Sequence, residues 1–259
     1  MKHPQLTYFT LGEGITAFSS TRHEGVSTGN YGTFNINPFC GDDAEAVRIN
    51  RAALCEELGV EPEKLIMPRQ IHGVGLQNIV NRVLIKPQSE RNQLLDGFDG
   101  VMTDVPNVCI GVSTADCLPI LLYDPVHKAV CAVHAGWRGT VQRIVQKAVA
   151  KMHVCYGTEA PQIRACIGPG ISLTHFEVGD EVYSAFEQAG FEMSQIARRY
   201  AKWHIDLEEC NRLQLTEIGV QTAQIHVSGI CTYENVDDYF SARRLGTASG
   251  RIFSGILIR

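Results

Sequence analysis

Short apolar segments, each bounded by turn residues, recur through most of this chain and limit the folds it can adopt. Apolar runs of about four to eight residues between turn signals are typical of β-strands. They cover residues 15–20, 65–72, 76–80, 100–104, 108–114, 118–124, 129–134, 163–168 and 223–229. We expect this many strands to form more than one sheet.

Helical patterns are fewer. Apolar residues spaced by three and four positions predict a helix over 141–156, with Thr140 as its N-cap and Gly157 beyond its end. Cap and stop residues predict further helices over 43–58, 180–189 and 207–218. Because strands outnumber helices and their order is irregular, we expect an α+β fold of mixed β-sheets with flanking helices. We find no internal repeat and no linker-like run, and this favours a single domain over 1–259.

Charge and composition restrict the partners. The 259 residues carry a formal net charge of −5 and contain no basic run, so we expect no nucleic-acid partner. No stretch approaches the ~20 apolar residues of a membrane span, and the amino terminus lacks the apolar core of a signal peptide. We therefore expect a cytoplasmic protein with no membrane contact. The nine cysteines include no CxxC pair and are interpreted mostly as reduced thiols.

The pair Asp116-Cys117 lies between two apolar segments and is the first candidate site. An unpaired carboxylate is costly to bury, and Pro119 removes a backbone donor two residues later, so the interruption favours a functional role. The competing interpretation is a core position, because free cysteine is among the most buried residue types. We predict Cys117 and Asp116 as catalytic residues, with Asp116 orienting a ligand or acting as general base.

Two histidines that end apolar segments, His72 and His134, could converge with Cys117. Three protein ligands with a vacant fourth position are the arrangement of a catalytic zinc site. The residues therefore allow a zinc site at His72, Cys117 and His134, with copper as an adventitious occupant because Cu²⁺ outcompetes Zn²⁺ on most ligand sets. A metal-free site, with Cys117 as nucleophile and a histidine as its base, uses the same residues differently.

Cationic and amide side chains beside these positions are candidates for substrate contacts. Arg138 follows His134 in a loop of small residues and offers a planar cationic fork, and Arg243 could neutralise a phosphate. Arg69 and Gln70 lie shortly before His72, at the end of the apolar segment 65–72. We predict Arg69, Gln70, Arg138 and Arg243 as substrate-binding residues for a small polar metabolite.

Five motifs, taken in order, resemble those of the YfiH family, whose members have been labelled multicopper polyphenol oxidases. They are RQIHG (69–73), TADCLPILLYD (114–124), AVHAGWRGT (132–140), IGPGIS with FEVGDEV (167–182) and CTYENVDDYFSARRLGTASGR (231–251). The resemblance covers 17 to 253. It implies a fold similar to that of cysteine hydrolases of the cytotoxic necrotizing factor group, and a catalytic zinc held by His72, Cys117 and His134.

The same resemblance implies purine nucleoside chemistry. The activities are phosphorolysis of adenosine, inosine, guanosine and methylthioadenosine, and deamination of adenosine. A second branch of the family implies the alternative of a cysteine-dependent amidase that removes L-serine from UDP-N-acetylmuramyl precursors. A multicopper oxidase is disfavoured, because the nine histidines contain no His-x-His pair. The sequence does not indicate an oligomeric state.

Overall fold

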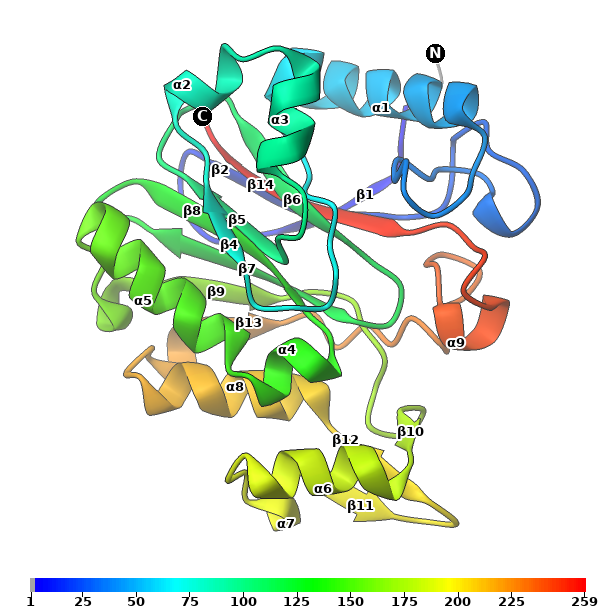
Figure 1. The fold of residues 1–259 in the computed structure, drawn as a ribbon, viewed down its shortest axis with the longest axis vertical. Coiled ribbons are helices and arrows are strands. Elements are labelled where there is room, and N and C mark those ends of the chain that lie inside the picture. The colour runs from blue at the N-terminus through cyan, green and yellow to red at the C-terminus, as the bar shows by residue number, and fades with distance from the viewer. Residues whose placement is uncertain (1–2) are drawn as a thin grey trace.

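Two β-sheets stacked face to face form the centre of the molecule, and helices cover their outer faces (Figure 1). The chain is seen in a computed structural model that describes residues 3–259. A third, small sheet lies apart from the other two, at the lower end of the view. The predicted α+β architecture of mixed sheets with flanking helices is therefore confirmed.

The larger sheet has six strands in the order β13-β9-β7-β8-β5-β4. Its four inner strands pair antiparallel, and the two outermost pairs are parallel. The strands are β4 (Leu76–Asn78), β5 (Gly100–Thr103), β7 (Leu118–Asp124), β8 (Ala129–Ala135), β9 (Arg164–Ile167) and β13 (Ile225–Val227).

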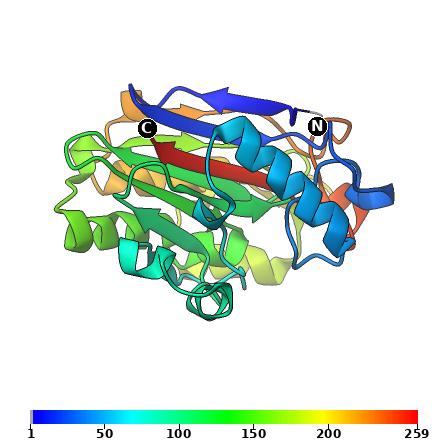
Figure 2. The same ribbon diagram turned by 90° about the horizontal axis from the view of Figure 1, so that it is seen from above.

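The second sheet has five strands in the order β1-β2-β14-β6-β3. They are β1 (Leu6–Phe9), β2 (Ile15–Ser20), β3 (Leu65–Ile66), β6 (Cys109–Thr114) and β14 (Ile252–Ile258). Figure 2 shows the blue strands β1 and β2 along one edge of the molecule, with the red β14 beside them. Ile110 and Ile256 of this sheet share one apolar core with Leu121 and Ala132 of the six-stranded sheet, so the two sheets are packed against each other.

Helices complete the cores because successive side chains of a strand point to opposite faces. Ile120 and Leu122 of β7 face away from the sheet–sheet core and pack with Val145 and Leu215. These two residues belong to α5 (Ile144–Tyr156) and α8 (Leu207–Glu217), which cover the outer face together with α4 (Trp137–Val141) (Figure 1). On the other side, α1 (Ala44–Leu58) packs Leu54 against the five-stranded sheet.

The remaining elements are short. The small sheet consists of β10 (Glu177–Val178), β11 (Ala197–Arg199) and β12 (Trp203–Ile205), and α6 (Asp180–Gln188) and α7 (Met193–Ile196) lie beside it in Figure 1. Three further helices are α2 (Asn81–Leu84), α3 (Gln88–Leu94) and α9 (Ala242–Leu245). In the described part of the chain, no helix has both the length and the apolar character that a membrane crossing requires.

Two element predictions were wrong by three residues or more at one end. The strand expected over 65–72 ends at Ile66, because the amide groups of residues 71–73 donate to the carboxylate of Asp99 and not to a neighbouring strand. The helix expected over 141–156 begins at Ile144, since Arg143 has a left-handed backbone with φ of 63° that separates it from α4. The cap expected at Thr140 therefore lies inside α4, whose N-cap is Gly136.

Candidate metal centre

Strand register brings a cysteine and a histidine together at one end of the six-stranded sheet. In the β7–β8 pair, Leu118 lies opposite Ala135 and Pro119 opposite His134. Cys117, one residue before β7, is therefore held beside the end of β8. Asp116 precedes it with a φ of 82°, a left-handed conformation that turns the chain between β6 and β7.

His72 reaches the same place from the loop that follows β3, and its backbone is also left-handed, with φ of 61°. Its ring meets that of His134 edge-on, with ring centroids 4.8 Å apart. One donor atom from each of His72, Cys117 and His134 lies within 4.8 Å of the other two. The structure thus brings together the three residues that the sequence predicted as zinc ligands.

Asp99, which sequence reasoning did not find, holds both histidines in position. Its fully buried carboxylate accepts hydrogen bonds at Oδ1 from the His72 amide (2.9 Å) and makes a 2.8 Å hydrogen bond with His134 Nδ1. Oδ2 accepts from the Gly73 amide at 2.7 Å. Because Nδ1 of His134 is bonded to a carboxylate, Nε2 is the nitrogen available to a metal, as in the carboxylate–histidine pairs of zinc sites.

Because Gly136 has no side chain, the space between the donor side chains stays open. A Cβ atom added at Gly136 would lie 2.9 Å from Cys117 Sγ and 3.4 Å from His72 Cδ2. The backbone of Gly136 has an ordinary φ of −73°, so contact with the donors is what restricts this position to glycine. Close approach of a backbone to a ligand is a recurrent reason for glycine.

The donors also influence one another's ionisation. Burial raises the pKa of the Cys117 thiol, but the charge of His134 and hydrogen bonds from both histidines outweigh burial and lower this pKa to about 6. Burial lowers the pKa of His134, and the Cys117 thiolate and Asp99 carboxylate together raise it to about 9. At neutral pH the metal-free pair is therefore a thiolate and an imidazolium, and thiolate is the form that binds metal.

A cavity of about 380 Å³ opens over the donors. Its wall includes His72, Cys117 and His134, together with Gln70 from the sequence-predicted set. The remaining lining residues are Asn37, Phe39, Cys40, Pro68, Ser113, Thr114, Ala115, Ala242, Thr247 and Arg251. Donors in the wall of a cavity of this size can meet a small-molecule ligand.

The side chain of Asp116 points away from this cavity. Its Oδ1 accepts from the Thr232 hydroxyl at 2.7 Å, and its Oδ2 accepts from the Arg243 amide at 2.6 Å. These two bonds fix the left-handed turn that presents Cys117. The catalytic role predicted for Asp116 stays a prediction, and neither of these two bonds joins its carboxylate to His72 or His134.

Of the four predicted substrate contacts, only Gln70 lines the cavity. Its amide exchanges two hydrogen bonds with the backbone of Ser113, of 2.9 and 2.7 Å. Arg69 pairs with Asp96 on the surface, and Arg138 stacks over the ring of Trp137 at 4.3 Å. Arg243 donates to the backbone carbonyl groups of residues 175 and 177.

Two cavity residues that the sequence reasoning missed can contact a ligand. The guanidinium group of Arg251 donates to the Ser249 hydroxyl and to the backbone carbonyl groups of residues 247, 249 and 250, and it has no carboxylate partner among the described residues. Phe39 is 53% exposed, a large apolar side chain at the cavity rim. The signal for Arg251 was present in the last motif, where the arginine follows a Gly-containing turn.

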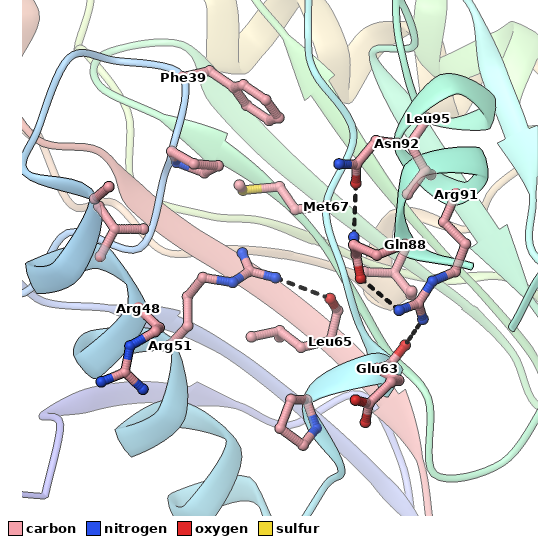
Figure 3. Close-up of a pocket in the computed structure, with 15 residues that line it drawn as sticks. Phe39, Arg48, Arg51, Glu63, Leu65, Met67, Gln88, Arg91, Asn92 and Leu95 are labelled. Carbon is pink, nitrogen blue, oxygen red and sulfur yellow. Dashed lines mark hydrogen bonds between the residues drawn. The ribbon is translucent and has the colours of Figure 1, made fainter. Parts of the chain in front are cut away.

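A larger cavity of about 440 Å³ shares Phe39 with the first but contains none of the three donors. Figure 3 shows Arg51 at its centre, donating to the Leu65 carbonyl group, and Arg91 at its edge, bonded to Gln88 and to the Glu63 carbonyl group. If volume alone were considered, this cavity would be the candidate site. The converging metal donors favour the smaller one.

Known proteins resemble this chain over nearly its whole length. A family model described as "Multi-copper polyphenol oxidoreductase laccase" matches residues 16–259. A protein of Bacteroides thetaiotaomicron named "Purine nucleoside phosphorylase" is 47% identical over 247 residues, which cover 94% of this chain and 92% of the relative. "Adenosine deaminase RL5", from an unknown prokaryotic organism, is 42% identical, with 94% of each chain covered.

Solved structures share the fold over nearly the whole chain. "Crystal structure of Bacillus licheniformis hypothetical protein YfiH" superposes with a TM-score of 0.90 at 26% identity and covers 99% of this chain and 97% of its own. YlmD from Geobacillus stearothermophilus superposes with a TM-score of 0.88 at 30% identity, covering 95% and 93%. The resemblance to the YfiH family drawn from the five motifs is confirmed.

Proposed function

Since the chain belongs to the family described as multi-copper polyphenol oxidoreductase laccase, which includes relatives named purine nucleoside phosphorylase, we propose that it is a zinc-dependent purine nucleoside enzyme. The observation that carries the proposal is the convergence of His72, Cys117 and His134 in the wall of a cavity. The proposed substrates are adenosine, inosine, guanosine and methylthioadenosine, cleaved by phosphate.

The donor set fits zinc. Two imidazole nitrogens and one thiolate are preferred zinc ligands, and three protein ligands leave the open position of a catalytic site. The Asp99–His134 hydrogen bond and the absence of a side chain at Gly136 both favour a cation among these donors. When bound, zinc would supply Lewis-acid polarisation of a substrate atom. Copper would suit the same ligands and is the adventitious alternative.

The remaining cavity residues would bind the two substrates. The Arg251 guanidinium has no carboxylate partner among the described residues and would hold phosphate, because its planar fork matches a phosphate oxygen pair. The half-exposed ring of Phe39 would stack on the purine. In the reaction a phosphate oxygen forms a bond to C1′ of the sugar as the bond from C1′ to the base nitrogen breaks, giving free base and sugar 1-phosphate.

Adenosine deamination is a second proposed activity of this cavity, motivated by the relative named "Adenosine deaminase RL5". It differs from phosphorolysis in needing water and not phosphate as the attacking group. The two activities are therefore separable by their dependence on phosphate concentration.

The test is to incubate purified protein with inosine and phosphate, and to measure hypoxanthine and ribose 1-phosphate. We expect product formation that depends on phosphate, and a KM for phosphate that rises roughly 10-fold or more in Arg251→Met, since a lost charge-assisted hydrogen bond is worth about 1.5–3 kcal/mol. Arg138→Met is the matched control, because Arg138 is exposed and lies outside the cavity lining. Equal KM values for Arg251→Met and the parent protein would remove Arg251 from the phosphate site.

A metal-free cysteine amidase is the competing function, and one geometry favours it. Cys117, His134 and Asp99 are linked in the order nucleophile, base and orienting carboxylate. Its substrate would carry an amide such as the L-serine linkage of a UDP-N-acetylmuramyl precursor. In that case a chelator would leave activity intact and zinc would inhibit, whereas the nucleoside enzyme would lose activity with its metal.

A further inference from the structure

A second group of metal-ligating side chains lies outside the cavity. His175 comes from the connection between β9 and β10, and Cys231 and Glu234 come from the segment that follows β13. One donor atom from each lies within 4.8 Å of the other two, the same convergence as at the first centre. In the part of the chain that the structure describes, this group and the group of His72, Cys117 and His134 are the two sets of side chains that could hold a metal ion.

Backbone hydrogen bonds fix the two segments side by side. Gly170 and Cys231 form an isolated parallel bridge. The Gly170 amide donates to the Ile230 carbonyl group at 3.1 Å, and the Thr232 amide donates to the Gly170 carbonyl group at 2.9 Å. A turn in which the His175 amide donates to the Ser172 carbonyl group at 3.0 Å then returns the chain toward Cys231. These backbone hydrogen bonds hold the segments that carry the donors side by side.

The side chains are arranged as an open ligand set. Cys231 is 5% exposed, and the Ser172 amide approaches its Sγ at 3.5 Å. Nε2 of His175 lies 2.8 Å from Oε1 of Glu234, and the imidazole ring stacks on Tyr233 with centroids 4.4 Å apart. The buried hydroxyl of Ser172 has no partner among the described residues. Glu234 is exposed, and this gives an ion access from solvent.

The charges around the group permit a cation. Arg243 and Arg244 lie close by, but their guanidinium groups donate to the backbone carbonyl groups of His175, Glu177 and Tyr233. Among the described residues, the Glu234 carboxylate is thus bonded to the His175 ring and not to these arginines. The two arginines oppose a cation, and a thiolate together with a carboxylate would offset a divalent charge.

We propose that His175, Cys231 and Glu234 form a second binding site for a divalent metal ion of the zinc class. Imidazole, thiolate and carboxylate are the three ligand types that zinc takes in proteins. On binding, the His175–Glu234 hydrogen bond is replaced by a bond from each residue to the ion, and the Cys231 thiol releases its proton to solvent.

The site has a structural consequence for the first centre. Thr232, next to Cys231, donates its hydroxyl to Asp116, and the Arg243 amide donates to the same carboxylate. Asp116 directly precedes Cys117. A metal that clamps the 231–234 segment therefore steadies the turn that presents Cys117, and the two sites are linked through Asp116.

The experiment is zinc stoichiometry by mass spectrometry after equilibration with excess zinc and removal of free metal. We expect two zinc ions per chain in the parent protein, one in His175→Phe, one in His72→Ala and none in the double variant. Phenylalanine keeps the ring that stacks on Tyr233 and removes the donor nitrogens. His23→Ala is the control, because His23 pairs with Asp238 at 2.8 Å and belongs to neither group of metal donors.

Cobalt gives a readout that is independent of activity. In the Cys117→Ala background, where Cys231 is the remaining thiol of the two donor groups, Co²⁺ should produce a thiolate-to-cobalt absorption band, and Glu234→Gln, an exposed isosteric change, should weaken it. The absence of any band in that background, or equal zinc content in His175→Phe and the parent protein, would overturn the proposal. A failure of the first centre would instead leave one zinc in the parent protein and none in His175→Phe.

Discussion

Asp99 shows how one buried side chain organises a site. Its two oxygens bond the His134 ring and three consecutive amide groups of the His72 loop, and its carboxylate is fully buried. The His134 hydrogen bond and charge lower the pKa of Asp99 despite its burial, so it stays ionised. Both histidines proposed as ligands are bonded to this group, one through its ring and one through its backbone.

Replacing Asp99 with asparagine should therefore weaken metal binding. The Asp99→Asn change keeps the size of the side chain but removes its charge. It also places an NH₂ group, a donor, against the Gly73 N–H, which is itself a donor. Zinc affinity should fall about 10–100-fold, the usual effect of losing a carboxylate that orients a histidine ligand. Competition with a chromophoric chelator measures it. Asp104→Asn, at an exposed position, should match the parent protein, and equal affinities in all three proteins would contradict the role of Asp99.

The ionisation of Cys117 predicts how metal-free protein reacts with iodoacetamide. A pKa lowered to about 6 means that thiolate predominates above this pH, and that alkylation slows as the pH falls through it. His134→Gln should move the midpoint upward, because the imidazolium that stabilises the thiolate is gone. The rate is measured in a Cys155→Ala background, since Cys155 is the exposed thiol. A midpoint near ~8.5, the value of an unperturbed thiol, would contradict the coupling.

Individual residues of the site were predictable from sequence to different degrees. Apolar runs are ended or interrupted by His72, Cys117 and His134, and a polar residue at such a position indicates a functional site. Asp99 gives a weaker signal, because it looks like an ordinary turn residue before β5, and only the pairing of Gly100 with Val133 puts it beside His134. Arg69 and Arg138 are adjacent in sequence to site segments, but their side chains point to Asp96 and Trp137.

At the scale of elements, strong periodic or capped segments were predictable. The strand Leu118–Asp124 and the helix Ala44–Leu58 agree with expectation, the latter with Asp43 as N-cap and Gly59 in a left-handed C-cap. β14 was missed although it lies at the centre of a sheet. Its Gly255, where a Cβ would clash with Phe18 and Phe253, breaks the apolar pattern that marks a strand. Packing between sheets, and not local sequence, explains that glycine.

The junction of β8 and α4 should be sensitive to any side chain. In Gly136→Ala the new Cβ would contact Cys117 Sγ at 2.9 Å, and we expect metal content to fall well below that of the parent protein. Asp43→Ala is the control, because it removes the α1 cap at a cost of about 1 kcal/mol of stability and Asp43 does not line the cavity. It should retain its metal. Full metal content in Gly136→Ala would contradict this prediction, because it would mean that the backbone moves far enough to accept the added methyl group.

For the whole molecule, we propose that 1–259 is one cooperative domain. The two main sheets share a core, and α8 joins the region of the small sheet to the outer face of the six-stranded sheet. Thermal unfolding followed by far-ultraviolet circular dichroism should then coincide with unfolding followed by fluorescence of Trp137 in α4 and Trp203 in β12. An earlier fluorescence transition would mean that the small sheet melts separately.

The central claim is that His72, Cys117 and His134 hold a zinc ion on which activity depends. The most direct measurement is metal content of untagged protein purified without added metal, beside Cys117→Ala and Cys155→Ala, with inosine phosphorolysis assayed on all three. We predict zinc and activity in the parent protein and in Cys155→Ala, and loss of activity together with one zinc ion per chain in Cys117→Ala. Metal-free protein that remains active until Cys117 is alkylated would contradict the account and favour the amidase.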